Sequence, residues 1–376
     1  MQNSKTRTWA EISMDALENN LKSIRGAIAP NCKIMGIVKA NAYGHGAVQV
    51  SRQLEDLGCN YLAVATLQEA EQLREAEISL PILILSHTPS ELLSRVLAAD
   101  CAQALGSPDD ANDYSREMCR LGKTLRVHIK LDTGMSRTGF YVADGSVDKL
   151  LSVLALPGLD AEGVFTHLAV ADEPDQRDFT LRQFELFCSA VAKAEAASGK
   201  MFAVKHCANS AGVLNYPQLH LDMVRAGISL YGVSPGENCH MTNACPVMSL
   251  KTHIIQISHL HAGDTISYGR RFLADRDMTV AVLPIGYADG LHRVLSGKID
   301  VLIRGKRCRQ LGTICMDLCM VDISNCEGAA LHDTAVIFGH DGDVFISAEE
   351  LAEKGGTIGY EILTSVSSRI PRIYVD

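Results

Sequence analysis

Short apolar runs alternate with longer amphipathic stretches from about residue 34 to residue 227. The apolar runs cover residues 34–38, 61–65, 82–85, 101–105, 125–131, 161–168, 202–205 and 223–224. Two of the intervening stretches, 66–76 and 178–198, have the length and pattern of helices. Strand–helix alternation indicates parallel strands joined by crossovers. Eight repetitions favour a closed (β/α)8 barrel over an open doubly wound sheet, so the expected fold class is α/β.

Beyond about residue 240 the pattern changes to β-rich runs separated by Gly/Asp turns. These runs cover residues 247–260, 278–283, 298–303, 319–323 and 335–338. One helix is expected at 347–354, because Ser347 and Glu350 have the spacing of a capping box and two glycines follow. We therefore predict a barrel over residues 10–240 and a mainly β domain over 241–376. We expect residues 1–9 to join the second domain, although the pattern alone leaves this open.

Composition narrows the class of protein. The chain has 376 residues, 47% of them hydrophobic and 21% charged, as expected of a globular protein with more than one domain. A net charge of −9 argues against nucleic acid as a partner. No apolar run approaches the roughly 20 residues that cross a bilayer, and the N-terminus lacks the pattern of a signal peptide, so we expect a cytoplasmic protein with no membrane partner. The twelve cysteines form no Cys-x-x-Cys pair, and no metal site is predicted.

Polar side chains stand where five of the eight predicted strands end. They are Lys39, Lys130 with Asp132, His167, His206 with Asn209 and Ser210, and Arg225. The carboxyl ends of barrel strands share one face, which carries the active site in proteins of this architecture. Lys39 ends an apolar run, and an amine held on a rigid strand can form an imine with a carbonyl cofactor. A lone strand-end lysine is more often a solvent contact, so the interpretation depends on the whole set.

A series of short motifs runs in order through both predicted domains. They are residues 9–12, 15–17, 39–46 (Lys-Ala-Asn-Ala-Tyr-Gly-His-Gly), 130–135, 209–211, 267–269, 286–290, 315–317 and 370–372. In these motifs the chain resembles the alanine racemase family. The resemblance implies a barrel followed by a β domain, and a homodimer with shared active sites. It also implies a pyridoxal 5'-phosphate enzyme that interconverts L-alanine and D-alanine, supplying D-alanine for peptidoglycan.

The resemblance also implies catalytic roles. Lys39 would hold pyridoxal phosphate covalently and act as one base, and Tyr268 of the partner subunit would be the other. Racemisation needs a proton removed from one face of the carbon and returned to the other, which two bases on opposite sides provide. His167, with Arg225 beyond it, would adjoin the tyrosine, and a cationic or hydrogen-bonding neighbour would favour the phenolate. Arg225 would face the ring nitrogen of the cofactor and, unable to accept a proton, would leave it unprotonated.

The same resemblance assigns the binding residues. Cofactor contacts would come from Lys39, Tyr43, His167, Asn209, Ser210, Arg225, Gly227, Ile228 and Tyr360, of which Tyr43, Ser210, Gly227, Ile228 and Tyr360 would hold the phosphate. Arg137 and Met316 would bind the substrate carboxylate, with Met316 coming from the partner subunit. Tyr287 would lie at the entrance. Lys130 matches a lysine that in relatives can be carbamylated and pair with the arginine at the Arg137 position.

Two departures from the family pattern and three alternatives remain open. Ala226 stands where relatives commonly carry proline, and Thr313 where arginine is common. A serine or broad-specificity racemase is the nearest alternative, but Tyr360 occupies a position where serine-preferring relatives have a smaller polar residue. A non-catalytic pyridoxal-phosphate carrier would lack the second domain. A decarboxylase would need an acid against the ring nitrogen, where Arg225 stands.

Overall fold

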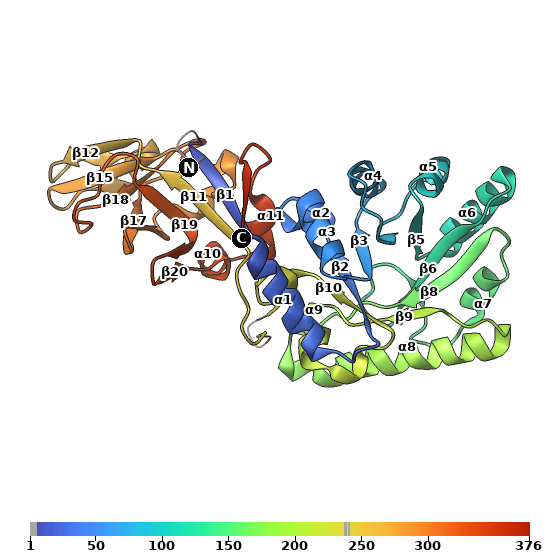
Figure 1. Ribbon diagram of the computed structural model, residues 1–376. Coiled ribbons are helices and arrows are strands. Elements are labelled where there is room, and N and C mark those ends of the chain that lie inside the picture. Colours follow the sequence, from blue (N-terminus) through green and yellow to red (C-terminus); the bar gives the residue numbers. More distant parts are fainter. Residues whose placement is uncertain (1–5, 237–238, 240) are drawn as a thin grey trace.

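The computed structural model describes residues 6–236, 239 and 241–376, and its first region is a nearly closed parallel barrel (Figure 1). The barrel strands are β2 (Lys33–Ile37), β3 (Tyr61–Val64), β4 (Ile82–Ile84), β5 (Cys101–Leu105), β6 (Leu125–Asp132), β8 (Leu159–Phe165), β9 (Val204–His206) and β10 (Met223–Ala226). They are hydrogen-bonded in the order β10-β2-β3-β4-β5-β6-β8-β9. Between β9 and β10, Arg225 N donates to Ala208 O at 2.9 Å. The predicted eight-strand barrel is confirmed.

Helices follow most barrel strands and cover the outside of the barrel (Figure 1). They are α1 (Met14–Ala27), α3 (Ala47–Asp56), α4 (Leu67–Glu75), α5 (Leu93–Ala98), α6 (Pro108–Leu121), α7 (Asp148–Leu154), α8 (Arg177–Ser198) and α9 (Ser210–Asn215). Local signals set several of their ends: Ser107 caps α6 through Asp110 N, and Gly122 ends the helix in the left-handed conformation. Helices α4 and α8 lie where the amphipathic stretches 66–76 and 178–198 predicted them.

The second region is a ten-stranded sheet. Its strands are β1 (Thr8–Ser13), β11 (Met248–His253), β12 (Gln256–Leu260), β15 (Met278–Leu283), β16 (Asp300–Ile303), β17 (Lys306–Leu311), β18 (Cys319–Asp322), β19 (Thr334–Asp341), β20 (Val344–Ile346) and β21 (Arg372–Val375). Strand β1 pairs antiparallel with β11 and parallel with β21, so the two ends of the chain meet in this sheet (Figure 1). The predicted single run 247–260 is two strands, because the chain leaves one ladder at Ile254 and joins another at Gln256.

Small elements complete the molecule. Strand β7 (Phe140–Tyr141) extends the barrel sheet, and β13 (Thr265–Ile266) pairs with β14 (Phe272–Leu273). Two helices, α10 (Ala348–Gly355) and α11 (Gly359–Ser365), pack together near the sheet. The predicted capping box of α10 is only half made: Ser347 accepts from Glu350 N, but the Glu350 carboxylate binds Arg307 and Lys354 instead of returning to the cap. Helix α11 has no counterpart among the sequence predictions.

One hydrophobic core runs through the barrel and into the sheet. A second, smaller cluster lies beneath β13 and β14 and consists of Ile266, Ala274, Met278, Val280 and Leu311. This small cluster lies under the turn that carries Tyr268. The turn is therefore supported by apolar packing that is separate from the main core. Within the described residues, no helix is long and apolar enough to cross a membrane.

Candidate active site

Lys39 begins a turn of the backbone that is left-handed. Residues 40–43, none of them glycine, have φ angles of 51–55°. This conformation costs roughly 1–2 kcal/mol per residue relative to a right-handed turn, so four in a row store appreciable strain. Hydrogen bonds from Gly44 N to Ala40 O and from Gly46 N to Asn41 O, both 3.0 Å, close the turn. The surrounding structure must supply the rest of the support.

Glu69, on helix α4, provides part of that support. Its Oε1 accepts from Ala40 N at 2.6 Å and its Oε2 from Ala65 N at 2.7 Å. The same carboxylate completes a capping box with Thr66 at the start of α4. One side chain therefore joins the end of β2, the end of β3 and a helix N-terminus, which fixes the position of Lys39.

His45 supports the turn from the other side. Its Nδ1 lies 2.9 Å from Ala42 O and 3.0 Å from Tyr43 O, and its ring stacks on Tyr231 with centroids 4.4 Å apart. Burial lowers the pKa of His45 to about 4, so the imidazole is neutral at neutral pH. Because both contacts are carbonyl oxygens, Nδ1 must carry the proton. His45 is thus a structural part of the turn.

Arg225 is a buried cation in the mouth of the barrel. Its Nη1 donates to Nδ1 of His206 at 3.1 Å and to the His206 carbonyl at 3.2 Å. Its Nη2 donates to Nδ1 of His167 at 3.1 Å and to the carbonyls of Thr166 and Cys207 at 2.9 and 3.0 Å. Arg225 pairs with no carboxylate and its Nε–H has no acceptor in the described part of the chain, so one donor remains for a ligand.

The guanidinium decides the proton positions on both neighbouring imidazoles. It can only donate, so Nδ1 of His167 and Nδ1 of His206 must be acceptors and the proton of each ring lies on Nε2. Burial and the neighbouring Arg225 hold the pKa of both histidines well below the usual range. Burial also lowers the pKa of Arg225 to about 10, which leaves it charged at neutral pH. From the sequence, His167 could be either a cation or a neutral hydrogen-bond donor. These contacts fit the neutral donor.

Two lysine amines share the mouth of the barrel. Burial lowers the pKa of Lys39, and the guanidinium groups of Arg137 and Arg225 lower it further while Glu69 raises it. Burial and the same two arginines lower the pKa of Lys130 to about 8, and its Nζ donates to Thr138 Oγ1 at 2.5 Å. A lowered pKa increases the fraction of neutral, nucleophilic amine at neutral pH.

The ends of β9 and β10 form a cradle of small polar groups. Ser210 Oγ accepts from Gly227 N at 3.0 Å and from Ser229 N at 3.4 Å. A Cβ at Gly227 would lie 3.0 Å from the Tyr43 hydroxyl and 3.6 Å from Ser210 Oγ, so the missing side chain leaves room between these groups. A site of this kind suits a phosphate. Ala226 ends β10 paired with Gly36, and the predicted ligand Ile228 begins the next turn.

Two further predicted cofactor residues flank the cradle. The ring of Tyr360, at the start of α11, lies 6.0 Å from the ring of Tyr43. Asn209 is the N-cap of α9, where its Oδ1 accepts from Gly212 N at 2.9 Å. Its side chain therefore orders the backbone that presents Ser210.

Tyr268 is not joined to this mouth within one chain. It lies on the turn between β13 and β14 and its side chain is 71% exposed. Ser267 before it has φ 67° and ψ −175°, a region almost confined to glycine, and donates from its hydroxyl to Thr313 O at 2.6 Å. Thr313 Oγ1 donates in return to Tyr268 O at 3.0 Å. Thr313, the departure from the family pattern, thus holds the backbone of Tyr268.

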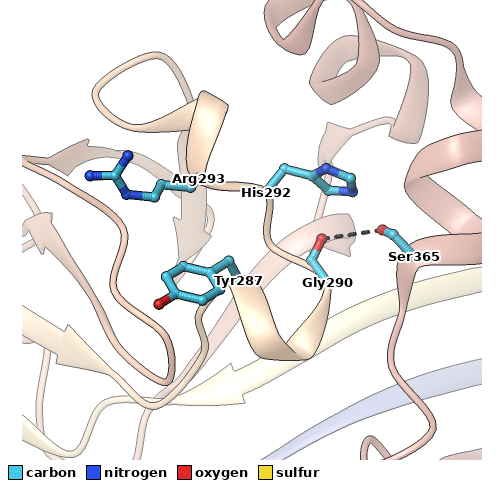
Figure 2. A pocket seen from close by; sticks show the side chains of 5 residues that line it. All are labelled: Tyr287, Gly290, His292, Arg293 and Ser365. Carbon is cyan, nitrogen blue, oxygen red and sulfur yellow. Dashed lines mark hydrogen bonds between the residues drawn. The ribbon is translucent and has the colours of Figure 1, made fainter.

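Met316 and Tyr287 occupy neighbouring loops of the same domain. Tyr287 N and Ala288 N donate to Cys315 O and Met316 O, both at 3.0 Å, and both predicted side chains are exposed. Tyr287 lines a cavity of about 310 Å³ together with Gly290, His292, Arg293 and Ser365 (Figure 2). The barrel, together with Tyr360 from α11, thus carries the other predicted residues, whereas Tyr268, Met316 and Tyr287 stand exposed on the β domain.

The sequence interpretation missed three supports of the site. Glu69 was not assigned, although its capping-box spacing from Thr66 marked it as an ordering residue. His206 was noted at a strand end but given no role, although it is hydrogen-bonded to Arg225. Tyr231, whose hydroxyl donates to Ile37 O at 2.9 Å beneath Lys39, gave no sequence signal.

Acidification is expected to destabilise the fold through the buried histidines. The pKa is lowered to about 4 in His45 and to about 3 in His128, and further histidines shift the same way. Below pH 6.5 the unfolded chain binds protons that the folded chain does not, so stability falls as the pH falls towards these values. These two groups together give a slope of about 2.5 kcal/mol per pH unit near pH 5. Urea unfolding at pH 7 and pH 5 and fixed protein concentration measures it; equal unfolding free energies would contradict the prediction.

Comparison with known protein families finds matches to both halves of the chain. Residues 12–235 match the family model described as alanine racemase, N-terminal domain, and residues 247–374 match alanine racemase, C-terminal domain. A protein of Desulforamulus reducens named alanine racemase is 40% identical over 99% of this chain and 100% of its own length. One of Methanococcus maripaludis with the same name is 41% identical over 98% of both chains.

Solved structures agree with the sequence comparison. The alanine racemase of Clostridium difficile 630 superposes with a TM-score of 0.92 at 38% identity, covering 99% of this chain and 96% of the other. The alanine racemase of Bacillus anthracis with bound L-Ala-P gives a TM-score of 0.92 at 34% identity, covering 99% and 95%.

Proposed function

The chain belongs to the alanine racemase family, an isomerase family that depends on pyridoxal phosphate, and we propose that the residues around Lys39 carry out the reaction. One observation carries the assignment of roles. Arg225 is a buried cation with no carboxylate partner in the described chain and with a free Nε–H, in the same mouth as a lysine whose pKa is lowered. This arrangement suits an aromatic ring nitrogen that must accept a hydrogen bond and stay unprotonated.

Pyridoxal phosphate, when bound, supplies the electron-withdrawing group that acidifies the Cα–H of the amino acid. Lys39 holds the cofactor through its amine and exchanges a proton with Cα on one face. The partner subunit's Tyr268 exchanges a proton on the other face. The left-handed turn supports this role because it fixes the Lys39 backbone within one hydrogen-bonded unit.

Arg225 limits the reaction to proton transfer. Its guanidinium stays protonated at neutral pH, so a ring nitrogen placed against it would receive a hydrogen bond but no proton. The cofactor would then withdraw electrons from Cα less strongly, which would limit side reactions. His167, neutral and with its proton on Nε2, hydrogen-bonds towards the tyrosine and favours its phenolate.

The binding residues complete the site. Tyr43, Ser210, Gly227, Ile228 and Tyr360 hold the phosphate, with Asn209 ordering the loop, and Arg137 with the partner subunit's Met316 holds the substrate carboxylate. Lys130 is a candidate for carbamylation, because a pKa of about 8 leaves part of the amine neutral and able to add carbon dioxide with release of a proton. The resulting anion would offset the charge of Arg137.

The protein acts as a homodimer. Three large side chains with assigned roles are exposed in the single chain: Tyr268 by 71%, Met316 by 53% and Tyr287 by 42%. Such exposure is explained if these side chains complete the active site of a partner subunit. We divide the chain into a cofactor-binding barrel and a β domain with the predicted boundary at residues 240/241, but the predicted start of the barrel at residue 10 moves to residue 14, because β1 (Thr8–Ser13) pairs with β11 and β21 of the second sheet. The pairing of β1 with β11 supports joining residues 1–9 to the second, although residues 1–5 lie outside the described residues.

Substrate preference tests the alternatives that remain. The match of both halves to the family excludes the lone-barrel carrier. The ring of Tyr360 lies 6.0 Å from that of Tyr43. We propose that it takes the space that a hydroxymethyl group would need, so kcat/KM for L-alanine should exceed that for L-serine by at least about tenfold. Chiral chromatography of each reaction with pyridoxal phosphate measures both rates, and Tyr360→Ser should narrow the ratio. Faster turnover of L-serine by the unaltered enzyme would make it a serine racemase.

A further inference from the structure

Three buried polar atoms in the barrel interior lie close together and have no hydrogen-bond partner among the residues that the structure describes. They are the hydroxyl of Tyr61, Nε2 of His128 and Oε2 of Glu162, from strands β3, β6 and β8. His128 Nε2 lies 3.9 Å from Glu162 Oε2, and the rings of Tyr61 and His128 are 5.7 Å apart. That separation is too long for a direct hydrogen bond, whereas a water beside the line that joins the two atoms can reach both. Buried polar atoms are rarely left unsatisfied, and a water needs two to four such partners.

The cluster is connected to Arg225 by a chain of imidazoles. Nη1 of Arg225 donates to Nδ1 of His206, and His206 Nε2 lies 2.9 Å from Nδ1 of His128. Because the guanidinium can only donate, His206 is protonated on Nε2 and donates to His128 Nδ1. His128 must therefore carry its proton on Nε2, the atom that faces Glu162. The direction of every hydrogen bond follows from the charge of Arg225.

Packing holds both imidazoles in this order. A Cβ at Gly163 would lie 2.5 Å from Nδ1 of His128, so the glycine provides the space that this ring occupies. Phe165 stacks on His206 with centroids 4.9 Å apart and an interplanar angle of 7°. The Arg225 guanidinium lies 5.5 Å from the centroid of the same phenylalanine ring. Neither imidazole can turn over without disturbing its neighbours.

We propose that Tyr61, His128 and Glu162 enclose an ordered water, and that His128, acting through His206, is a positioning residue for Arg225. The water accepts from His128 Nε2–H, donates to the Glu162 carboxylate and has the Tyr61 hydroxyl as its third partner. The chain fixes the tautomer of His206 and thereby keeps an acceptor in front of Nη1, which sets the orientation of the guanidinium. The effect on turnover rests on the role proposed for Arg225, whereas the proton positions do not.

Nitrogen NMR of the holoenzyme labelled with [15N]histidine tests the proton positions. Long-range 1H–15N spectra distinguish the two tautomers, and both His128 and His206 should be protonated on Nε2 at pH 7. A high-resolution crystal structure should contain a water within hydrogen-bond distance of all three atoms. A proton on Nδ1 of either ring, or a site without the water, would overturn the proposal whatever the enzyme's activity.

A matched pair of variants tests the positioning role. His128→Leu removes the acceptor for His206, and His128→Asn keeps a polar group near the Nδ1 position. His128→Leu should change the His206 spectrum and lower kcat about threefold to tenfold without changing KM for alanine. His128→Asn should restore most of the wild-type His206 spectrum and most of kcat.

A second pair of variants, Glu162→Leu and Glu162→Gln, makes the same comparison at the partly exposed end of the chain of hydrogen bonds, in case His128→Leu fails to fold. His261→Asn, at an 83% exposed side chain, controls for loss of a histidine. An unchanged His206 spectrum in both leucine variants would refute the role.

Discussion

Replacing Lys39 by alanine should lower kcat for alanine racemisation by at least about 10⁴-fold, because the change removes both the attachment point of the cofactor and one of the two bases. The left-handed turn should remain, since its hydrogen bonds run through the backbone, Glu69 and His45 and do not use the lysine amine. Lys149→Ala, at an exposed position on α7, is the matched control and should leave kcat unchanged. Substantial activity in the Lys39 variant would remove the lysine from the mechanism.

Lys130 is the other lysine that could bind the cofactor covalently, because its amine lies in the same mouth of the barrel and its pKa is also lowered. Borohydride reduction of the holoenzyme followed by peptide mass spectrometry separates the two. The cofactor should be found on the peptide that contains Lys39. Label on the Lys130 peptide would reverse the assignment, whatever the kinetic result.

Tyr268→Phe should lower kcat by about 10²–10⁴-fold, the usual contribution of one general acid–base group. The phenylalanine keeps the ring and removes only the hydroxyl, and Thr313 continues to hold the backbone of residue 268. Lys39 still serves its own face of the carbon, so one enantiomer of alanine should continue to exchange its α-proton with deuterated water while the other does not. Equal exchange of both enantiomers would show that Tyr268 is not the second base.

Mixing the two inactive variants tests whether the sites are shared. A heterodimer of a Lys39→Ala subunit and a Tyr268→Phe subunit contains one site with both defects and one with neither. Half of the dimers in an equal mixture are heterodimers, so unfolding and refolding the two together should restore about a quarter of the wild-type rate. No recovery, with dimers present by light scattering, would mean that Lys39 and Tyr268 of the same chain work together.

Much of the barrel site could be predicted because strand ends are local features. Each apolar run that stops at a polar residue marks the end of a buried strand, and Lys39, Lys130, His167 and Arg225 were found in this way. Parallel strands in a barrel bring such ends to one face, so proximity followed from the fold class alone. The β-rich run 247–260 gave no sign of its division into two strands, because the break at Ile254 depends on which neighbours each half pairs with.

Contacts between side chains could not be predicted by the same reasoning. The capping box of α10 has the right spacing, but Glu350 binds Arg307 from strand β17 instead. The left-handed turn after Lys39 has no glycine at residues 40–43, so nothing in those residues indicates a positive φ. Its support comes from Glu69, His45 and Tyr231, which only the folded chain brings together.

The sequence by itself determined the fold class, the family and the identity of the residues in the mouth of the barrel, because apolar periodicity and ordered motifs are properties of the chain. Only the tertiary structure decided how those residues are held. The proton positions on His167 and His206 follow from the charge of Arg225, which cannot accept a hydrogen bond. The strain after Lys39 persists because Glu69 and Tyr231, both distant in sequence, support the turn together with the adjacent His45. Both are consequences of distance and direction in space, which a linear pattern does not contain.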